Sequence, residues 1–397
     1  MTTAAATPAV ADETIKCAIC GARVHAIHMH LKSDHSEVTP EEYKEKYPGE
    51  PMFSQKAIEA IKKREAEKAK EAAAGTPGEK VNTHTHSTSK KVVFHDLFGL
   101  GRNAATISAS GKDIMVTQCA PAAEYESMIP EVDPNYVFNL DILKTLMMGL
   151  EMRIPTYLWG HAGTGKTTIF EQIAAYTRRP LFRVQHTANM EEEHIVGGWR
   201  LRDGKTHFEL GPLAMAMRYG WLYMADEYDF GRPEVTSVYQ AVLEGKPLVI
   251  KEADPDNRVI KPHPDFRIVA TGNTNGQGDE TGLYSGTNLQ NSANYERFGV
   301  VQRMDYMNKD LEERLVSQQG RIPLADAKKL VDFAKRIRDE FDGGRLGNPI
   351  SPRSLIYAAK IGVGKRDFKQ GLDLAFINRL SSTDREAARQ VAQRVFS

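Results

Sequence analysis

Residues 160–167 read GHAGTGKT and place three glycines, a lysine and two threonines in eight positions. The order matches G-x-x-x-x-G-K-[ST], the pattern of loops whose backbone N–H groups surround a phosphate chain. YLW before the loop is typical of a short strand, and TTIFEQIAAYT after it is typical of a helix. The alternative is a chance match in an ordinary turn, and the strand–loop–helix context argues against it.

This loop predicts a site for a nucleoside triphosphate. We expect Lys166 to reach the β- and γ-phosphates and Thr167 to hold Mg²⁺. ATP and Mg²⁺ are therefore the predicted cofactors at this site. The residues expected to contact the nucleotide are Gly160, His161, Ala162, Gly163, Thr164, Gly165, Lys166, Thr167 and Thr168.

Hydrolysis requires an acidic pair at the end of a neighbouring buried strand, and GWLYMADEYDF provides one. Asp226 would bind the magnesium ion, and Glu227 would polarise the attacking water as general base. The alternative is a strand that simply ends in acidic turn residues.

Three further polar residues have the character of nucleotide sensors. Asn273 ends the apolar run FRIVATGN and could bond the γ-phosphate or the water. Arg297, in NYERFGV, could reach the nucleotide of a neighbouring subunit, where a guanidinium stabilises transition-state charge, and Arg303 is a rival for that role. Arg353, in ISPRSLIYAAK, could touch the same nucleotide from a helical domain. The alternatives are an ordinary strand end for Asn273 and surface or ion-paired side chains for the arginines.

Between about residues 130 and 310, short apolar runs alternate with helical segments. The runs PTYLWG, PLFRVQ, GWLYMADE and FRIVATGN are typical of buried parallel strands, with FRIVATGN the last strand candidate. The alternation predicts an α/β sandwich. Beyond 310, LADAKKLVDFAKRIRDEF and SPRSLIYAAKIG predict helices only.

Composition divides the whole chain into zones. The expected zones are a disordered tail over 1–16, a small Cys/His domain over 17–50, a charged helix and flexible linker over 51–90, an unassigned extension over 91–130, a nucleotide-binding domain over 131–310 and a helical lid over 311–397.

The phosphate loop, DE, strand-end Asn, RF and SPR occur in an order that resembles the AAA+ ATPases. The segment HIVGGWRLRDGKTHFELGPLAMAMRYGWLYMADE resembles the MoxR branch, and within it the CobS-type ATPase subunits of aerobic cobaltochelatase. The resemblance covers about 130–370. It implies a P-loop αβα sandwich with a helical lid, a ring, usually of six subunits, and a partner with a von Willebrand A-type (VWA) domain. It also implies inserts near 191–210 and 246–262.

A cluster of cysteines and histidines lies nearer the N-terminus, in CAICGARVHAIHMHLKSDH. Cys17 and Cys20, followed by His30 and His35, have the spacing of a zinc finger, and His28 could replace His30. Zn²⁺ is therefore the third predicted cofactor, the alternative being a chance cluster in a disordered tail. TPEE at 39–42 predicts a capping box for a following helix.

This finger resembles that of Ros/MucR-type regulators, which bind DNA. Only Arg23 and Lys32 supply positive charge within it, and DNA binding usually needs more phosphate contacts. We therefore favour a protein-docking finger over nucleic-acid binding.

The bulk composition limits the remaining classes. Lys plus Arg and Asp plus Glu each number 52, so net charge points to neither nucleic acid nor membrane. No apolar run approaches the roughly 20 residues of a membrane span. Three cysteines and no secretory signal pattern predict a cytoplasmic protein.

Three hypotheses follow, and we favour the first. The protein is a ring ATPase that remodels a partner, a nucleic-acid motor or regulator of the kind phages encode that uses the finger, or a nucleotide-gated scaffold that barely hydrolyses ATP.

Overall fold

The computed structural model describes residues 14–58, 89–279 and 282–397. Internal contacts divide the chain into two units, Met1–Thr85 and His86–Ser397. The tail expected over 1–16, the helix expected over 55–74 and the linker expected over 75–90 fall largely outside the described residues.

The first unit is a short hairpin followed by two helices. Strands β1 (Ile15–Lys16) and β2 (Arg23–Val24) pair antiparallel, and α1 (Ile27–Asp34) and α2 (Pro40–Lys46) follow. The Thr39 side chain accepts from the Glu42 backbone N–H while the Glu42 carboxylate accepts from the Thr39 N–H. This reciprocal arrangement is the expected capping box, and the prediction is confirmed.

The first unit extends beyond 17–50 at both ends. Ile15 and Lys16, expected in the disordered tail, pair with Val24 and Arg23. At the other end, Ile27 N–H donates to the Met52 carbonyl, and Ser54 N–H donates to the His25 carbonyl. Composition did not predict these contacts, because the flanking residues join the unit through backbone hydrogen bonds, which do not depend on residue type.

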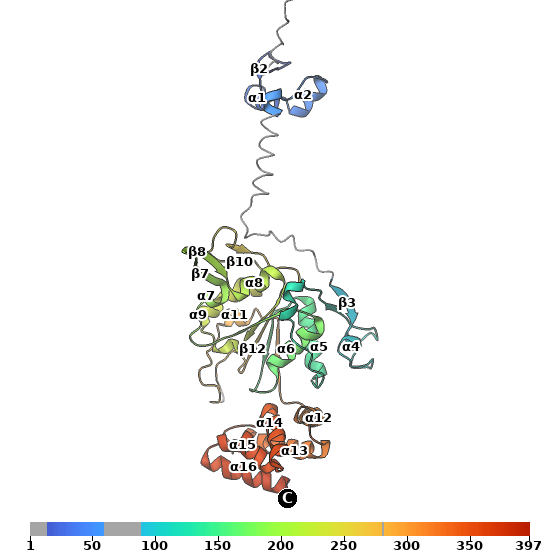
Figure 1. Ribbon diagram of the computed structural model, residues 1–397, viewed down its shortest axis with the longest axis vertical. Helices are drawn as coiled ribbons and strands as arrows, with labels where there is room; N and C mark the ends of the chain where they lie inside the picture. The colour runs from blue at the N-terminus through green and yellow to red at the C-terminus, as the bar shows by residue number, and fades with distance from the viewer. Residues whose placement is uncertain (1–13, 59–88, 280–281) are drawn as a thin grey trace, which may run out of the picture. The chain divides into compact units, whose positions relative to one another are not determined.

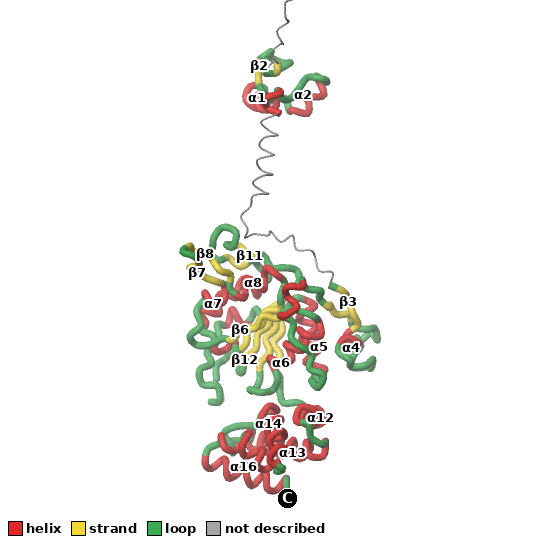
Figure 2. Tube along the Cα trace, viewed as in Figure 1, coloured by secondary structure: helices red, strands yellow, loops and turns green. Residues whose placement is uncertain are grey.

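A five-stranded parallel sheet forms the centre of the second unit (Figure 2). Its strand order is β13-β5-β12-β9-β6, and every neighbouring pair is parallel. The strands are β5 (Thr156–Trp159), β6 (Leu181–Gln185), β9 (Leu222–Asp226), β12 (Arg267–Gly272) and β13 (Val300–Arg303). The four predicted strands are present, but FRIVATGN is not the last one. The sequence analysis missed β13 because this edge strand is half exposed.

Helices cover both faces of this sheet. Leu158, Met224 and Val269 face the cluster that contains α5 (Leu140–Met152) and α6 (Lys166–Thr177). Tyr157, Ala225 and Ala270 face the other cluster. The elements on that second side are α7 (Glu193–Val196), α8 (Pro212–Tyr219), the 3₁₀ turns η2 (Tyr228–Phe230) and η3 (Ser237–Tyr239), α9 (Pro233–Thr236), α10 (Gln240–Leu243) and α11 (Ser292–Tyr295). The fold is thus the expected αβα sandwich.

The segment that the sequence left unassigned is packed on this domain. Strands β3 (Lys90–Val93) and β4 (Met115–Gln118) pair antiparallel, and α4 (Phe94–Leu97) and the 3₁₀ turn η1 (Ala123–Met128) accompany them. Phe94, Phe98 and Val116 join the apolar cluster of α5 and α6, so this extension completes the core. Cys119 of this segment is buried.

Two hairpins project from the sandwich at the positions of the expected inserts. The first consists of β7 (Gly197–Arg202) and β8 (Lys205–Leu210), and the second of β10 (Leu248–Val249) and β11 (Val259–Ile260). Trp199 Nε1 donates to the Glu252 carbonyl at 2.9 Å, which ties the hairpins together. Figure 1 shows both at the edge of the sandwich away from the C-terminal helices.

The C-terminal part is the expected helical lid. It contains α12 (Lys309–Gly320), α13 (Leu324–Asp342), α14 (Pro352–Lys365), α15 (Phe368–Ala375), the 3₁₀ turn η4 (Ile377–Arg379) and α16 (Ser382–Val395). These helices pack around an apolar cluster of their own. Buried Arg338 crosses it and binds both carboxylate oxygens of Glu312 at 2.7 Å.

Candidate functional site

The phosphate loop connects the carboxyl end of β5 to the first turn of α6. Gly160 and Gly163 have positive φ angles of +149° and +79°. A Cβ on Gly160 would lie 2.2 Å from the Met304 carbonyl oxygen, and one on Gly163 would lie 2.7 Å from Ser351 Cβ. Only glycine fits these two positions. The backbone turn that the glycines allow places the N–H groups of the loop beside the amino end of α6.

Lys166, the first residue of α6, is held under this loop. Its Nζ donates to the Gly160 carbonyl at 2.7 Å, the His161 carbonyl at 3.0 Å and Asn273 Oδ1 at 3.1 Å. Burial lowers the pKa of Lys166 to about 8, although Asp229, Asp226 and Glu227 favour the charged form. The negative charge of a bound phosphate chain would favour the protonated form of Lys166.

Asp226 ends strand β9 and is fully engaged. Its Oδ1 accepts from Thr167 Oγ1 at 2.9 Å and from the Thr271 hydroxyl. Its Oδ2 accepts from Arg183 Nε at 2.8 Å. A carboxylate beside the threonine hydroxyl of the phosphate loop is a donor set that suits Mg²⁺, and Arg183 supplies positive charge at the same carboxylate.

Glu227 follows in a left-handed conformation, with φ +53°. Its backbone N–H donates to Thr271 Oγ1 at 3.1 Å, and its Oε2 accepts from Gln185 Nε2 at 2.7 Å. Gln185, the last residue of β6, therefore holds the Glu227 carboxylate.

Asn273 is positioned through a buried carboxylate that the sequence analysis missed. Asp229 Oδ2 accepts from the N–H groups of Asn273 and Thr274, each at 2.8 Å, and from Thr274 Oγ1 at 2.9 Å. Burial raises the pKa of Asp229, and those hydrogen bonds oppose the rise. Asp229 therefore links the acidic end of β9 to the polar end of β12.

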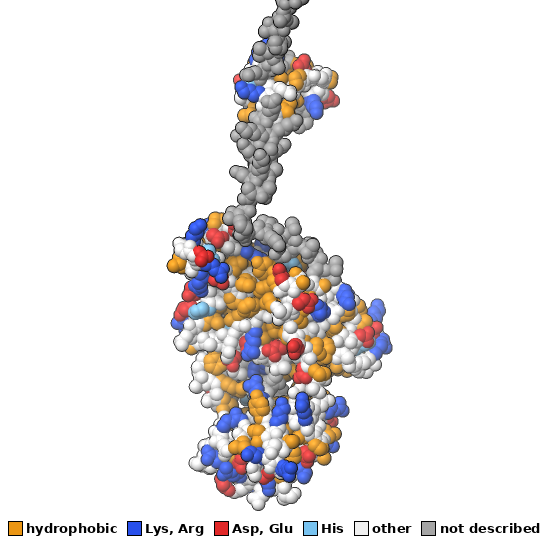
Figure 3. Space-filling view, viewed as in Figure 1, with side chains coloured by type: hydrophobic (Ala, Val, Ile, Leu, Met, Phe, Trp, Pro, Cys, Tyr) orange, Lys and Arg blue, Asp and Glu red, His pale blue; other side chains and the backbone are white. Residues whose placement is uncertain are grey.

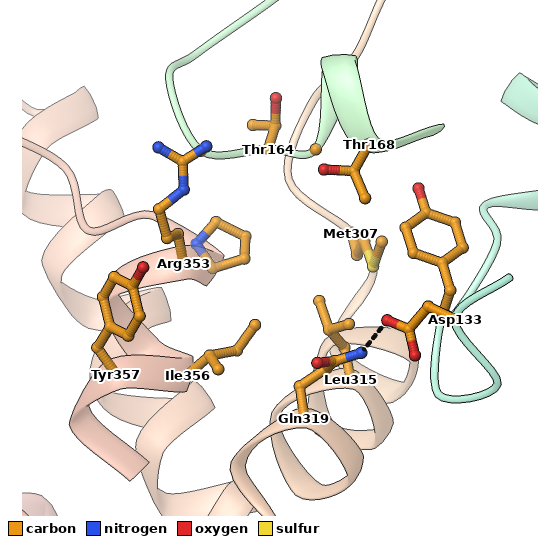
Figure 4. A pocket seen from close by; sticks show the side chains of 13 residues that line it. Asp133, Thr164, Thr168, Met307, Leu315, Gln319, Arg353, Ile356 and Tyr357 are labelled. Atoms are coloured by element: carbon orange, nitrogen blue, oxygen red, sulfur yellow. Dashed lines mark hydrogen bonds between the residues drawn. The ribbon is translucent and has the colours of Figure 1, made fainter. Parts of the chain in front are cut away.

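A cavity of about 240 Å³ opens between the phosphate loop and the lid (Figure 4). Residues of α12 and α14 face the loop across it. The lining residues are Asp133, Tyr136, Gly163, Thr164, Gly165, Thr168, Met307, Leu315, Gln319, Pro352, Arg353, Ile356 and Tyr357. The lining combines apolar side chains of α12 and α14 with the Arg353 guanidinium and threonine hydroxyl groups of the loop segment, a composition that suits a nucleotide between domain and lid.

The two candidate arginine fingers lie in different places. Arg303 stacks on the Trp159 ring at 5.2 Å and pairs with Asp305 at 2.6 Å, and it lines a second cavity beside Gly160 and His161. Arg297 lines neither cavity. Its Nε pairs with Glu244 at 2.6 Å, and its Nη1 bonds the Ala293 carbonyl.

Comparison with known proteins agrees with this geometry. A family model described as the AAA domain of the dynein-related subfamily matches residues 155–298, and one described as CbbQ/NirQ/NorQ C-terminal matches 312–396. The aerobic cobaltochelatase subunit CobS of a Sinorhizobium species is 33% identical over 282 residues, covering 68% of this chain and 84% of that protein. The chain belongs to the CobS/CbbQ family of AAA+ ATPases.

Two further similarities are a curated relative and a solved structure. Protein CbbQ of Hydrogenophilus thermoluteolus is 31% identical over 229 residues, covering 58% of this chain and 82% of that protein. Among solved structures, the Holliday junction branch migration motor RuvB of Thermotoga maritima aligns at 14% identity with a TM-score of 0.39, covering 62% of this chain and 72% of that chain.

The family fixes the general activity. As an AAA+ ATPase of this group the protein hydrolyses ATP, and ATP and Mg²⁺ are its expected ligands. ATPases of this type act as oligomers with partner proteins. Over residues 14–58, 89–279 and 282–397, no helix has both the length and the apolar character that crossing a membrane requires.

The Cys/His cluster of the first unit converges on one point. The ligand atoms of Cys17, Cys20, His30 and His35 all lie within 4.8 Å of one another. His28 instead packs against the Phe53 ring at 5.1 Å, so the structure favours His30 over His28 as the fourth ligand.

The surroundings of this cluster suit a metal. Burial opposes ionisation of the Cys17 thiol, but hydrogen bonds from the backbone of Cys20 and Ile19 outweigh it, and the pKa of the thiol is lowered. His30 Nδ1 lies 2.8 Å from Asp34 Oδ2, which leaves Nε2 facing the cluster. Buried His35 Nε2 has no hydrogen-bond partner among the described residues, and two thiols with two imidazoles form a tetrahedral zinc donor set.

Proposed function

We propose that this AAA+ ATPase forms a ring, most simply a hexamer, whose ATP hydrolysis remodels a partner protein with a VWA domain. The support is the position of Arg297: it lines neither cavity of its own phosphate loop, as expected if it serves a neighbouring subunit. The similarity to CobS, a subunit of aerobic cobaltochelatase, supports a chelatase-type partner.

In this mechanism, the loop N–H groups and Lys166 bind the β- and γ-phosphates, and Thr167 and Asp226 hold the magnesium ion. Bound Mg²⁺ supplies positive charge to the phosphate oxygens. Glu227 takes a proton from water as the water oxygen bonds to the γ-phosphorus, and the bond from that phosphorus to the β–γ bridging oxygen breaks. Asn273, held by Lys166 and by Asp229 through its N–H, orients the water and the γ-phosphate.

Two contacts must change before this step. Glu227 must leave Gln185 to approach the water, and Arg297 must leave Glu244 to reach the neighbouring nucleotide. Arg303 is the weaker candidate for the finger because it is already stacked on Trp159 within its own site.

The lid and the two hairpins would transmit the effect of ATP hydrolysis to the partner protein. Arg353, at the start of α14, senses the γ-phosphate from across the cavity. Loss of that phosphate shifts the lid against the sandwich, and the β7–β8 and β10–β11 hairpins transmit the shift to the partner.

Mixed rings test the central claim. Glu227→Gln and Arg297→Ala subunits should each be inactive alone, and mixing them should restore activity at about a quarter of the sites if subunits assemble at random. The matched control is Glu244→Gln, which frees Arg297 but keeps its guanidinium, and this variant should stay active. Mixed samples as inactive as their components would overturn a shared site.

For the first unit we propose a zinc finger that docks a protein partner. Its Cys/His geometry supports zinc. Over residues 14–58 six Lys and Arg residues are balanced by six Asp and Glu residues, and this balance does not favour nucleic acid. Figure 3 shows Lys and Arg interspersed with Asp and Glu over the visible face of the second unit and no extended basic surface there. Salt-sensitive DNA binding that disappears with Cys17→Ser would instead support the nucleic-acid hypothesis.

A further inference from the structure

The loop between β12 and α11, residues 274–291, is fastened at its base to the segment that follows the acidic pair. Gln290 N–H donates to the Gly276 carbonyl at 2.9 Å and closes the loop. Asn288 N–H donates to the Asp229 carbonyl at 2.7 Å, and Gln290 Nε2 donates to the Gly231 carbonyl at 3.1 Å. The loop therefore joins Asn273 to the helix that precedes Arg297 while it is anchored beside Glu227.

Tyr284, in the second half of this loop, contacts the phosphate loop. The Tyr284 hydroxyl accepts from the Ala162 backbone N–H at 3.1 Å and lies 2.9 Å from His161 Nδ1. Tyr284 N–H in turn donates to Asp279 Oδ2 at 2.7 Å. Tyr284 is half-buried and lines a cavity of about 180 Å³ together with Gly160 and Asn273.

The direction of one of these bonds is fixed. Ala162 N–H can only donate, so the Tyr284 hydroxyl accepts there, and its own proton is available to His161 Nδ1 when that nitrogen is unprotonated. Burial lowers the pKa of His161, and Arg303 and Lys166 add to this effect against Asp305 and Asp342. The His161 ring also stacks on Tyr306 at 5.7 Å, nearly parallel.

One of the two residues that the Tyr284 hydroxyl contacts, His161, also binds the ammonium group of Lys166. Lys166 Nζ bonds the carbonyls of Gly160 and His161 and the side chain of Asn273. Because this lysine is the group that reaches the β- and γ-phosphates, the Tyr284 cavity lies at the γ-phosphate end of the site.

We propose that Tyr284 is a positioning residue for ATP hydrolysis. Its hydroxyl holds the outer half of the phosphate loop, His161 and Ala162, against the loop that leads to Arg297. The geometry around the γ-phosphate is thereby coupled to the segment carrying the arginine. This inference rests on ATP hydrolysis at Lys166 and Glu227, and it needs neither the VWA partner nor the zinc finger.

Tyr284→Phe isolates the hydroxyl because the ring remains. We expect kcat for ATP to fall about tenfold, as for the loss of one positioning hydrogen bond. ADP affinity should stay within twofold, because the loop N–H groups beyond Gly163 and Lys166 hold the β-phosphate. The matched control is Tyr295→Phe, whose ring packs at the base of the same loop near Gly276, and it should keep full activity. Unchanged kcat in Tyr284→Phe, or ADP affinity falling in parallel with kcat, would overturn the proposal.

Hydrogen exchange of the Ala162 amide provides a second test that does not depend on turnover. In the nucleotide-free wild type this amide should exchange slowly, and in Tyr284→Phe it should exchange at least tenfold faster at an unchanged melting temperature. A fast-exchanging Ala162 amide in the wild type would contradict the contact, even if Tyr284→Phe does not fold. Slow exchange in a wild type that does not hydrolyse ATP would leave the contact intact and refute the proposed function instead.

Discussion

The phosphate loop follows a strand of a five-stranded sheet that two large apolar clusters flank. The Cys/His cluster lies in a unit whose described residues bury four apolar side chains together, those of Cys17, Ile27, Leu31 and Tyr43. A core as large as the first can hold a binding site in place without any ligand. A core of four side chains cannot, so in the smaller unit the ligands must help to hold the fold.

The polar groups of the two sites differ in the same way. Asp226 accepts hydrogen bonds from Thr167, Thr271 and Arg183, and Lys166 Nζ has three acceptors. In the Cys/His cluster, buried His35 Nε2 has no partner among the described residues. In the first site most polar groups are paired within the protein, although Asp229 Oδ1 is also buried without a hydrogen-bond partner among the described residues. In the second site the unpaired atom is one of the four proposed metal ligands, so a ligand is needed there.

The largest expected effect is on the small unit. Removing zinc with a chelator, or Cys17→Ser, should unfold the β1–β2 hairpin and the helices α1 and α2 of the first unit, because zinc binding to such sites contributes about 10–16 kcal/mol at pH 7. ATP hydrolysis and the melting transition of the second unit should not change. Circular dichroism, metal content and ATPase assays measure the three quantities.

Cys119→Ser is the matched control, because Cys119 is a buried cysteine of the second unit. This variant should retain one zinc per chain. If the first unit kept its fold without metal, the two sites would not differ in how far the fold depends on the ligand.

The second-largest expected effect is a loss of ATP hydrolysis that is confined to the nucleotide site. Lys166→Ala should reduce kcat/KM for ATP at least a hundredfold, about 2.7 kcal/mol of lost transition-state stabilisation. The zinc content and the melting temperature of the second unit should remain close to wild type, because the sheet positions the loop. Lys335→Ala, at an exposed position of α13, is the control and should be silent. A hundredfold loss accompanied by unfolding would mean that the loop supports the fold after all.

Much of the nucleotide site could be predicted because its chemistry is local in sequence. The glycines, Lys166 and Thr167 lie within eight residues, and Asp226 and Glu227 end an apolar strand. Four of the five strands were equally clear, since each is a bounded apolar run. Strand β13 was missed because VVQR is short and alternately exposed.

The residues that hold the site could not be predicted from such patterns. Asp229, Gln185 and Tyr284 act through partners 42 to 123 positions away, and none of them stands in a recognisable motif. Their roles depend on strand order, which brings the ends of β6, β9 and β12 together. Of these residues only Asp229, in YDF directly after the acidic pair, could have been suspected from the sequence, because a third acidic residue there is unusual for a simple turn.

The smallest predicted effect is a proton taken up on nucleotide binding. In the free protein the pKa of Lys166 is about 8 because of burial, and phosphate groups around it should raise that value. The bound pKa then exceeds the free pKa, so nucleotide affinity is fully present below pH 8 and falls as pH rises above it. At pH 8.5, MgATP binding should take up a large fraction of a proton, and at pH 7 close to none from this group.

Calorimetry at each pH, in buffers of different ionisation enthalpy, measures this uptake. Lys166→Arg is the matched control, because a guanidinium stays protonated and should show no uptake at pH 8.5. Zinc binding to thiols and imidazoles releases protons instead, so its affinity should fall as pH is lowered. Nucleotide affinity and zinc affinity should therefore change with pH in opposite directions. This result would support the difference between a nucleotide site that the fold positions and a zinc site that stabilises the fold. Equal uptake by Lys166→Arg and wild type would show that Lys166 is already fully charged in the free protein.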